Sequence, residues 1–282
     1  MKLCTWIPRR TCNSRWYSTR QVSGGGDALD VSARMPPQMP SSRLPELIAR
    51  RGNVAEYPEN TLPALRSALE LGARHLGFDV QLSVDRHPVL LNDSNLQRIA
   101  GVDRNALEMT WDELAEVAVT DSDIGIPRLG QAVDMLSSHA DTTAFVELKR
   151  ASLRAFGHET VVRKVCEVLK PLARQCVLVS ADFAAVHHVR QVSPYRIGWR
   201  LTEYTNTAAL KCEALAPEYL FCDHQLLTES ASKLWRGPWR WVVYDVRTAK
   251  LALELAARGA RMVETSAIRE MIREDRKEKM SD

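Results

Sequence analysis

Acidic and basic side chains stand where short apolar segments of this sequence end, and their types suit two kinds of chemistry. They are Arg50, Arg51, Asp79, Glu147 and Lys149. Carboxylates are the ligands that hard divalent cations prefer. Arginine and lysine bind phosphate, arginine through two parallel hydrogen bonds and lysine as a point charge. These residue types therefore indicate a site for a divalent cation, for a phosphate, or for both.

The apolar segments have the length and spacing of strands in an α/β protein. Strands are expected near 47–49, 76–82, 143–148, 176–180, 196–199, 219–222, 241–244 and 262–263. Helical patterns lie between most of them, such as 159–169, 183–192 and 248–258. Eight strand and helix units make a closed (β/α)₈ barrel, which is the fold class that we predict.

In such a barrel the functional site forms at the carboxyl ends of the strands. The candidates at this mouth are Arg50, Arg51, Asp79, Gln81, Asn92, Asp93, Glu147, Lys149, Ser180, Asp223, Tyr244 and Asp245. Side chains alternate along a strand, so Gly77, Asp79 and Gln81 share one face of theirs. His224 directly follows the sixth strand and is the histidine placed to reach the mouth.

Residues 88–139 interrupt the alternation and are expected to form an insertion after the second strand. A hairpin should open it, and a capping box from Thr110 to Glu113 should begin one of its helices. Before the insertion, Asn60 is expected to cap the helix that follows the first strand.

The ends of the chain differ in composition from its middle. We expect 1–43 to be a flexible leader rich in glycine and proline, 44–268 to be the barrel, and 269–282 to be a charged tail. The cysteines show no short ligand spacing, which favours reduced thiols in the cytoplasm. The first 26 residues contain arginine and no acidic residue, so a mitochondrial presequence is the alternative.

Charge and hydropathy narrow the range of partners. The formal net charge is +3, and basic and acidic residues are interspersed, which argues against nucleic acid as a partner. No apolar run approaches the roughly 20 residues that a transmembrane segment needs. A small molecule that carries a phosphate is the expected ligand, and a protein partner is an open alternative.

Four motifs, in order along the chain, resemble those of the glycerophosphodiester phosphodiesterase family. They are IARRG at 48–52, PENT at 58–61, GFDVQL at 77–82 and LND at 91–93. The resemblance extends over about 46 to 268 and implies the same barrel fold. It also implies cleavage of glycerophosphodiesters to glycerol phosphate and an alcohol, with two histidines as general acid and base and one divalent cation, Mg²⁺ or Ca²⁺, held by Glu, Asp and Glu.

The sequence departs from the family pattern at the positions that matter most for this reaction. Arg50 and Asn92 stand where the family has its histidines, and Gly77 stands where it has the first metal-binding Glu. Tyr244 replaces a usual Asn. Several family residues are kept, namely Arg51, Gly52, Glu59, Asn60, Asp79, Asp93, Glu147 and Lys149.

These substitutions predict a degenerate member of the family. Arginine stays protonated and asparagine has no proton to exchange near neutral pH, so the family's acid and base catalysis is lost. Metal binding by Asp79 and Glu147 should be weak or absent, and we expect no cofactor. Arg50, Arg51 and Lys149 should bind a phosphodiester, a phosphate or a phospholipid head group.

Two alternatives to this prediction stay open. In one, Arg50 forms a salt bridge with Asp79 or Glu147 and the pocket is a closed relic. In the other, the protein is an active phosphoric diester hydrolase of lipid metabolism that uses replacement residues.

Overall fold

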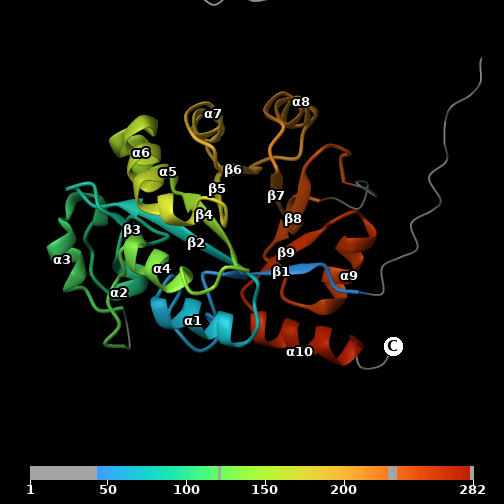
Figure 1. Ribbon diagram of the computed structural model, residues 1–282, viewed down its shortest axis with the longest axis horizontal. Coiled ribbons are helices and arrows are strands. Elements are labelled where there is room, and N and C mark those ends of the chain that lie inside the picture. Colours follow the sequence, from blue (N-terminus) through green and yellow to red (C-terminus); the bar gives the residue numbers. More distant parts are fainter. Residues whose placement is uncertain (1–42, 120–121, 228–233, 280–282) are drawn as a thin grey trace, which may run out of the picture. The chain divides into compact units, whose positions relative to one another are not determined.

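Parallel strands close into a barrel in the computed structural model, which describes residues 43–119, 122–227 and 234–279 (Figure 1). The strands of the ring are β1 (Glu46–Arg50), β2 (His75–Leu82), β4 (Thr143–Leu148), β5 (Cys176–Ser180), β6 (Arg196–Arg200), β7 (Tyr219–Asp223), β8 (Arg240–Tyr244) and β9 (Met262–Thr265). Each strand pairs in parallel with its neighbours, and β1 pairs with both β2 and β9, which closes the ring. The predicted (β/α)₈ barrel is confirmed. Residues 1–42 of the expected leader lie outside the described residues.

Helices cover the outside of the ring. They are α1 (Leu62–Glu70), α4 (Leu129–Leu136), α5 (Arg150–Phe156), α6 (His158–Leu169), α7 (Phe183–Val192), α8 (Asn206–Leu215), α9 (Ala249–Ala257) and α10 (Ile268–Lys279). The three helices predicted from periodicity, α6, α7 and α9, begin and end within one residue of their expected bounds.

Tryptophans pack on the outside of β8. Between β7 and β8 the described residues contain only one short helical turn, η3 (His224–Leu226). Trp239 and Trp241 are buried there, and the indole of Trp241 donates a hydrogen bond of 2.8 Å to the carbonyl of Trp235. These side chains therefore complete the packing of the outer layer.

The start of α1 differs from the sequence prediction. Thr61, and not Asn60, is the N-cap, and its hydroxyl accepts a hydrogen bond from the amide of Ala64. Asn60 adopts a left-handed conformation with φ 58°, and its amide nitrogen donates to Asp79. The expectation for Asn60 was wrong because a carboxylate from the neighbouring strand engages its side chain.

The insertion after β2 forms a small lobe of its own. β3 (Pro88–Leu90) pairs antiparallel with β2 and makes the predicted hairpin. The lobe also contains α2 (Gln97–Ala100), η1 (Ala106–Glu108) and α3 (Trp111–Ala115), and the capping box of Thr110 and Glu113 begins α3 as expected. Leu91, Leu96 and Leu114 belong to its separate apolar cluster.

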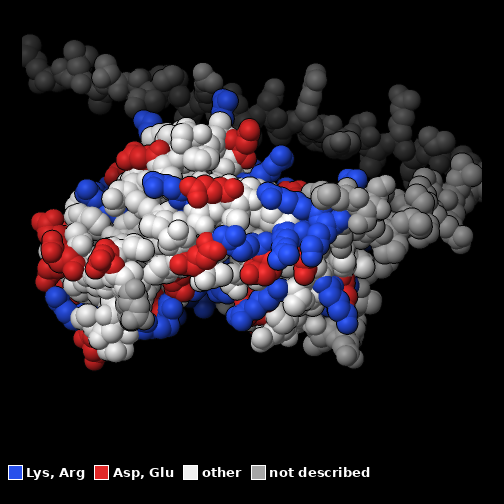
Figure 2. Space-filling view, turned by 90° about the horizontal axis from the view of Figure 1, so that it is seen from below, with Lys and Arg blue, Asp and Glu red and all other residues white. Residues whose placement is uncertain are grey.

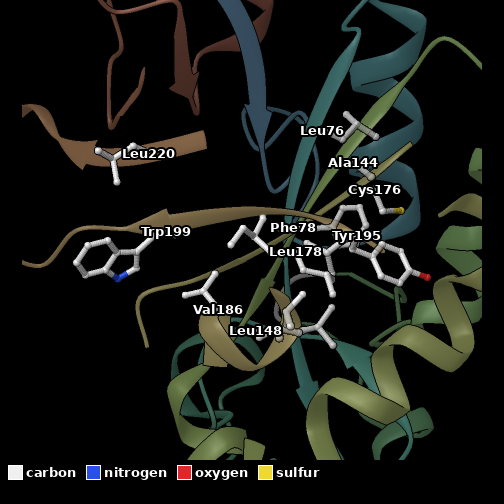
Figure 3. Close-up of a cluster of buried hydrophobic side chains, with 14 of the residues drawn as sticks. Leu76, Phe78, Ala144, Leu148, Cys176, Leu178, Val186, Tyr195, Trp199 and Leu220 are labelled. Atoms are coloured by element: carbon white, nitrogen blue, oxygen red, sulfur yellow. The ribbon is translucent and has the colours of Figure 1, made fainter. Parts of the chain in front are cut away.

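Two apolar layers result from the alternation of side chains along the strands. Val177 and Val179 of β5 point into the barrel, where they meet Phe221, whereas Leu178 points outward. Figure 3 shows part of the outer layer, in which Leu178 from β5 lies near Val186 from α7. The outer layer anchors the helices, and the inner layer forms the floor on which the polar mouth rests.

α10 occupies most of the segment expected to form a charged tail. Its Ile268 and Met271 are fully buried, and Arg276 donates a hydrogen bond of 2.8 Å to the carbonyl of Leu71. Figure 2 views the molecule from this side and shows basic side chains gathered over part of the face, with acidic ones among them. In the part of the chain that the structure describes, no helix has the length and apolar character that a membrane span requires.

Candidate functional site

A small polar cavity lies at the carboxyl end of the barrel. Its volume is about 10 Å³, which is room for about one water molecule. Phe145 and Phe221 line it from the barrel interior, and their rings meet edge to face at 5.7 Å. Its charged lining residues are Arg50, Arg51, Asp79, Glu147, Arg200 and Glu264. The cavity is therefore an ionic cluster on an aromatic floor.

Asp79 is buried between two cations and an amide. The guanidinium Nε of Arg51 lies 2.6 Å from one carboxylate oxygen, as an ion pair without the alignment of a hydrogen bond. Lys149 Nζ lies 3.3 Å from the other oxygen, and Asn60 donates a hydrogen bond of 3.0 Å. Burial alone would raise the pKa of Asp79, but Lys149, Arg51 and the Asn60 hydrogen bond hold it at about 2. Asp79 is thus ionised at neutral pH.

Glu147 also lies between two cations. Lys149 donates a hydrogen bond of 2.9 Å to one of its oxygens, and Nε of Arg200 lies 3.0 Å from the other. Burial lowers the pKa of Lys149, but the carboxylates of Asp79 and Glu147 outweigh it and raise that pKa above its ordinary value. Lys149 therefore joins the two family carboxylates as a charged side chain.

Arg200 at the end of β6 is the cation between Glu147 and Glu264. It donates a hydrogen bond of 3.0 Å to Glu264, which stands on β9. Its guanidinium lies 4.3 Å from the ring centre of Tyr244 and 5.0 Å from that of Phe221, so it also makes cation–π contacts. Burial would lower the pKa of Arg200, but Glu147 and Glu264 raise it. The side chain is permanently charged and only 12% exposed.

Glu264 fills the space beside Gly77. A Cβ atom on Gly77 would lie 2.8 Å from a carboxylate oxygen of Glu264, closer than real Cβ contacts come. Glu264 is buried and comes from a strand on the other side of β1. The position where the family has its first metal-binding Glu thus borders a carboxylate supplied by a different strand.

Arg50 lines the cavity but pairs with a carboxylate outside the inner set. Its guanidinium lies 3.6 Å from Asp245, and its side chain is 28% exposed. It does not form the salt bridge with Asp79 or Glu147 that was one alternative from the sequence. The neighbouring Arg51 donates a hydrogen bond of 2.7 Å to the Asn92 side chain, which is half-buried and is not among the residues that line the cavity.

Four of the other candidates from the sequence have structural partners. Gln81 bonds to Ser152 and to the carbonyl of Asn92, and Asp93 pairs with Arg98. Ser180 donates to the carbonyl of Leu148, and Asp223 caps the turn after β7. None of the four is among the residues that line the described cavity.

The histidines lie outside this cluster. His75 is at the start of β2, and its ring nitrogen lies 2.9 Å from Glu46 at the opposite end of the barrel. Burial lowers the pKa of His75, although Glu46 opposes the shift. His224 is half-buried in η3 and is not among the residues that line the cavity.

Arg200 and Glu264 are the site residues that sequence reasoning missed. The predicted strands ended at Trp199 and Val263, one residue before each of them. The alternation could have found them, because Arg200 shares a face with Gly198, and Glu264 shares a face with Met262, which points into the barrel. The apolar runs stop just before these charged residues, but the strands continue.

The carboxylates at the mouth do not fit a divalent cation in this arrangement. Asp79, Glu147 and Glu264 are each engaged by at least one cation, and Arg200 lies between the latter two. Among the described residues, no group of three or more His, Cys, Asp or Glu side chains has a geometry that could hold a metal ion. A divalent ion would meet the charges of three basic side chains at close range.

Three residues at this mouth have left-handed backbones. They are Arg51 (φ 58°), Asn60 (φ 58°) and Asp245 (φ 60°). Such conformations cost about 1–3 kcal/mol each for residues with side chains and cluster at functional sites. Here the side chains of Arg51 and Asn60 contact Asp79, and that of Asp245 contacts Arg50.

Comparison with solved structures shows the same fold in known phosphodiesterases. The chain superposes on an Oleispira antarctica phosphodiesterase, solved with the product sn-glycerol-3-phosphate, with a TM-score of 0.71, 21% identity and coverage of 83% of this chain and 97% of that one. A glycerophosphodiester phosphodiesterase from Thermotoga maritima gives a TM-score of 0.67, 22% identity and coverage of 81% and 97%.

Sequence comparison identifies the family. The chain is 28% identical over 130 residues to a glycerophosphodiester phosphodiesterase of Bacillus altitudinis, which is 44% of this chain and about half (53%) of that protein. It is 29% identical over 133 residues to human glycerophosphodiester phosphodiesterase 1, covering 44% of this chain and 37% of that one. The model of the glycerophosphoryl diester phosphodiesterase family matches residues 51–263. With the barrel and the motif residues at its mouth, this match shows that the chain belongs to the glycerophosphoryl diester phosphodiesterase family.

Proposed function

We propose that this protein binds a phosphate-bearing small molecule at the mouth of its barrel and does not hydrolyse it by the family's route. The ligand would be a phosphodiester, a free phosphate or a phospholipid head group. The cavity of about 10 Å³ is too small for a phosphate, so the ligand would lie at the outer edge of the mouth. Arg50, which lines the cavity and is 28% exposed, would reach it there.

The proposal depends on the long distance between Arg50 and its partner Asp245. Arg51, Lys149 and Arg200 each lie within 3.3 Å of two carboxylates. Arg50 has Asp245 at 3.6 Å, which is longer than a hydrogen bond. An oxyanion can therefore replace Asp245 at little cost and form the bidentate contact that guanidinium favours.

The chemistry of the two substituted positions supports the loss of hydrolysis. The Asn92 amide accepts a hydrogen bond from Arg51 and donates one of 2.6 Å to Asp93, so it is held without a proton to transfer. Arg50 cannot act as a base near neutral pH. General acid or base catalysis is worth about 10² to 10⁴ in rate for each group, so the loss of both removes most of the acceleration.

Calorimetric titration with sn-glycerol-3-phosphate tests the binding proposal. The full chain should bind it, Arg50→Met should weaken binding at least about tenfold, and Asp245→Asn should strengthen it because it removes the competing carboxylate. Arg163→Met, an exposed arginine on α6 paired with Glu167, is the matched control and should bind as the wild type does. Absence of binding to the wild type, or unchanged binding by Arg50→Met, contradicts the proposal.

The second candidate function is that of an active phosphoric diester hydrolase. It is favoured by the family match and by relatives that are named as phosphodiesterases, such as that of Bacillus altitudinis. Purified protein should be assayed against several glycerophosphodiesters with Mg²⁺, Ca²⁺ or Mn²⁺. We expect no turnover above background. Turnover that Asp79→Ala and Glu147→Ala abolish would establish the hydrolase instead.

A third candidate is a scaffold for a protein partner with a pocket that binds nothing. This function predicts that Arg50→Ala leaves every binding activity of the protein intact. The same titration with sn-glycerol-3-phosphate therefore separates it from the first candidate.

The cysteines support a reducing compartment such as the cytoplasm. The four described cysteines, Cys166, Cys176, Cys212 and Cys222, are free. Burial raises the pKa of Cys166 to about 11 and that of Cys176 to about 12, so these thiols stay protonated and unreactive. A mitochondrial location, suggested by the N-terminal sequence, is the alternative.

A further inference from the structure

We propose that Arg200 is a built-in replacement for the divalent cation of the family and that Glu264 replaces the carboxylate missing at Gly77. The inner cluster would then be an anionic trio, Asp79, Glu147 and Glu264, permanently neutralised by side chains of the same chain. This inference concerns how the cluster is neutralised and does not depend on whether the outer mouth binds phosphate.

The first step of the argument is the position of Arg200. One side chain reaches both Glu147 and Glu264, with Nε 3.0 Å from the former and Nη2 3.0 Å from the latter. A metal ion shared by two carboxylates has the same relation to them. The guanidinium also makes cation–π contacts with Phe221 and Tyr244, two rings of the inner apolar cluster.

The second step is the balance of charge. The inner cluster contains the carboxylates of Asp79, Glu147 and Glu264 and the cations of Arg51, Lys149 and Arg200; Glu59, which also contacts Arg51, does not line the cavity and is neutralised by Arg98. The two sets balance, and every one of these side chains is at most 20% exposed. A divalent ion added to this cluster would create an uncompensated buried charge, which is strongly unfavourable.

The third step is the coupling of Gly77 to Glu264. The absence of a side chain on Gly77 leaves the space that the Glu264 carboxylate occupies, since a Cβ there would lie 2.8 Å from its Oε1. The carboxylate count of the site is therefore preserved while its source moves from β2 to β9. Removal of Arg200 alone should leave three carboxylates facing two cations, which is a site that attracts a divalent ion.

Titration with Mn²⁺, followed by electron paramagnetic resonance, tests this inference on the full chain. The wild type should show no saturable site, whereas Arg200→Met should gain one, with binding at least about tenfold tighter than any seen in the wild type. Arg200→Met combined with Glu264→Gln should lose that gain. Arg50→Met removes an arginine that does not lie between the carboxylates and is the matched control; it should gain nothing.

A second variant and a second measurement cover the case in which Arg200→Met does not fold. Arg200→Lys keeps one positive charge and should still exclude Mn²⁺. Crystals of the wild type soaked in Mn²⁺ should give no anomalous peak between Glu147 and Glu264. A peak there, equal Mn²⁺ binding by Arg200→Lys and Arg200→Met, or a folded Arg200→Met that binds no Mn²⁺ overturns the inference. Failure of the sn-glycerol-3-phosphate titration leaves these outcomes unchanged, so the two proposals fail separately.

Discussion

The two sides of the barrel mouth differ in how many of the family's residues they contain. On the side of β1, β2 and β4, the family residues Arg51, Asp79, Glu147 and Lys149 are all present and paired with one another. On the side of β6, β8 and β9, Arg200 and Glu264, which lie outside the motifs, form a second cluster with Tyr244, which departs from the family pattern.

The difference shows that a carboxylate absent from β2 can be supplied by a strand on the other side of the mouth. The gap at Gly77 on β2 is filled by Glu264, which reaches across from β9. Glu147 joins the two sides, because Lys149 contacts one of its oxygens and Arg200 the other. Comparison of motifs covers only the side of β1, β2 and β4, although residues from both sides determine what the mouth can bind.

The largest expected effect is the loss of stability on removing Arg200. Arg200→Met leaves Glu147 short of one cation and Glu264 without its partner in the cluster, and breaking a buried ion pair costs about 3–5 kcal/mol. Urea unfolding at pH 7 should show this fall in the free energy of unfolding. Arg51→Met should cost less, because Asp79 keeps Lys149 and Asn60. Equal losses for the two variants would remove the distinction between the sides.

An intermediate effect, and a dependence on pH, is expected for Asp79. Its pKa in the folded protein is about 2, below its ordinary value of 3.8, so ionised Asp79 stabilises the fold above pH 4 and this contribution is lost as the pH falls toward 2. The contribution is about 2 kcal/mol. The difference in unfolding free energy between the wild type and Asp79→Asn should therefore narrow by about that amount between pH 5 and pH 2. Asp112→Asn, which removes an exposed carboxylate on α3, is the control for a change of net charge alone.

The smallest expected effect tests the contact between the sides. Gly77→Ala places a methyl group against Glu264 and should destabilise the fold by about 1 kcal/mol, the lower end of overpacking costs. The same substitution in a Glu264→Gln background, measured as a double-mutant cycle, should cost a different amount, since the two residues are in contact. Gly130→Ala on α4, where a Cβ meets nothing within 4 Å, should be neutral or stabilising. Additive effects at Gly77 and Glu264 would show that the two sides are independent.

The sequence predicted the fold well for a physical reason. Apolar alternation and helix caps are local patterns, and the strand β5 and the helix α7 begin and end where those patterns do. The cap of α1 was harder, because Asn60 and Thr61 are both suitable and the choice depends on Asp79, which is distant in sequence.

The candidate site was predicted only in part. Residues in the family motifs could be placed, since their spacing fixes their strands. Arg200 and Glu264 are charged residues inside a barrel, where charge is rare unless it is paired, and each pairs with a partner more than fifty positions away. A single sequence does not reveal such partners, so the cation between the carboxylates could not be identified as Arg200.

The space shared by Gly77 and Glu264 also restricts which residues position 77 can hold. A Gly77→Glu substitution alone would place two acidic groups where one fits. The nearby guanidinium of Arg200 already pairs with Glu147 and Glu264. A glutamate fits at position 77 only if the Glu264 carboxylate moves, and a divalent ion fits between Glu147 and Glu264 only if Arg200 leaves that place. The residues at positions 77, 200 and 264 therefore depend on one another, and a change at one of them requires changes at the others.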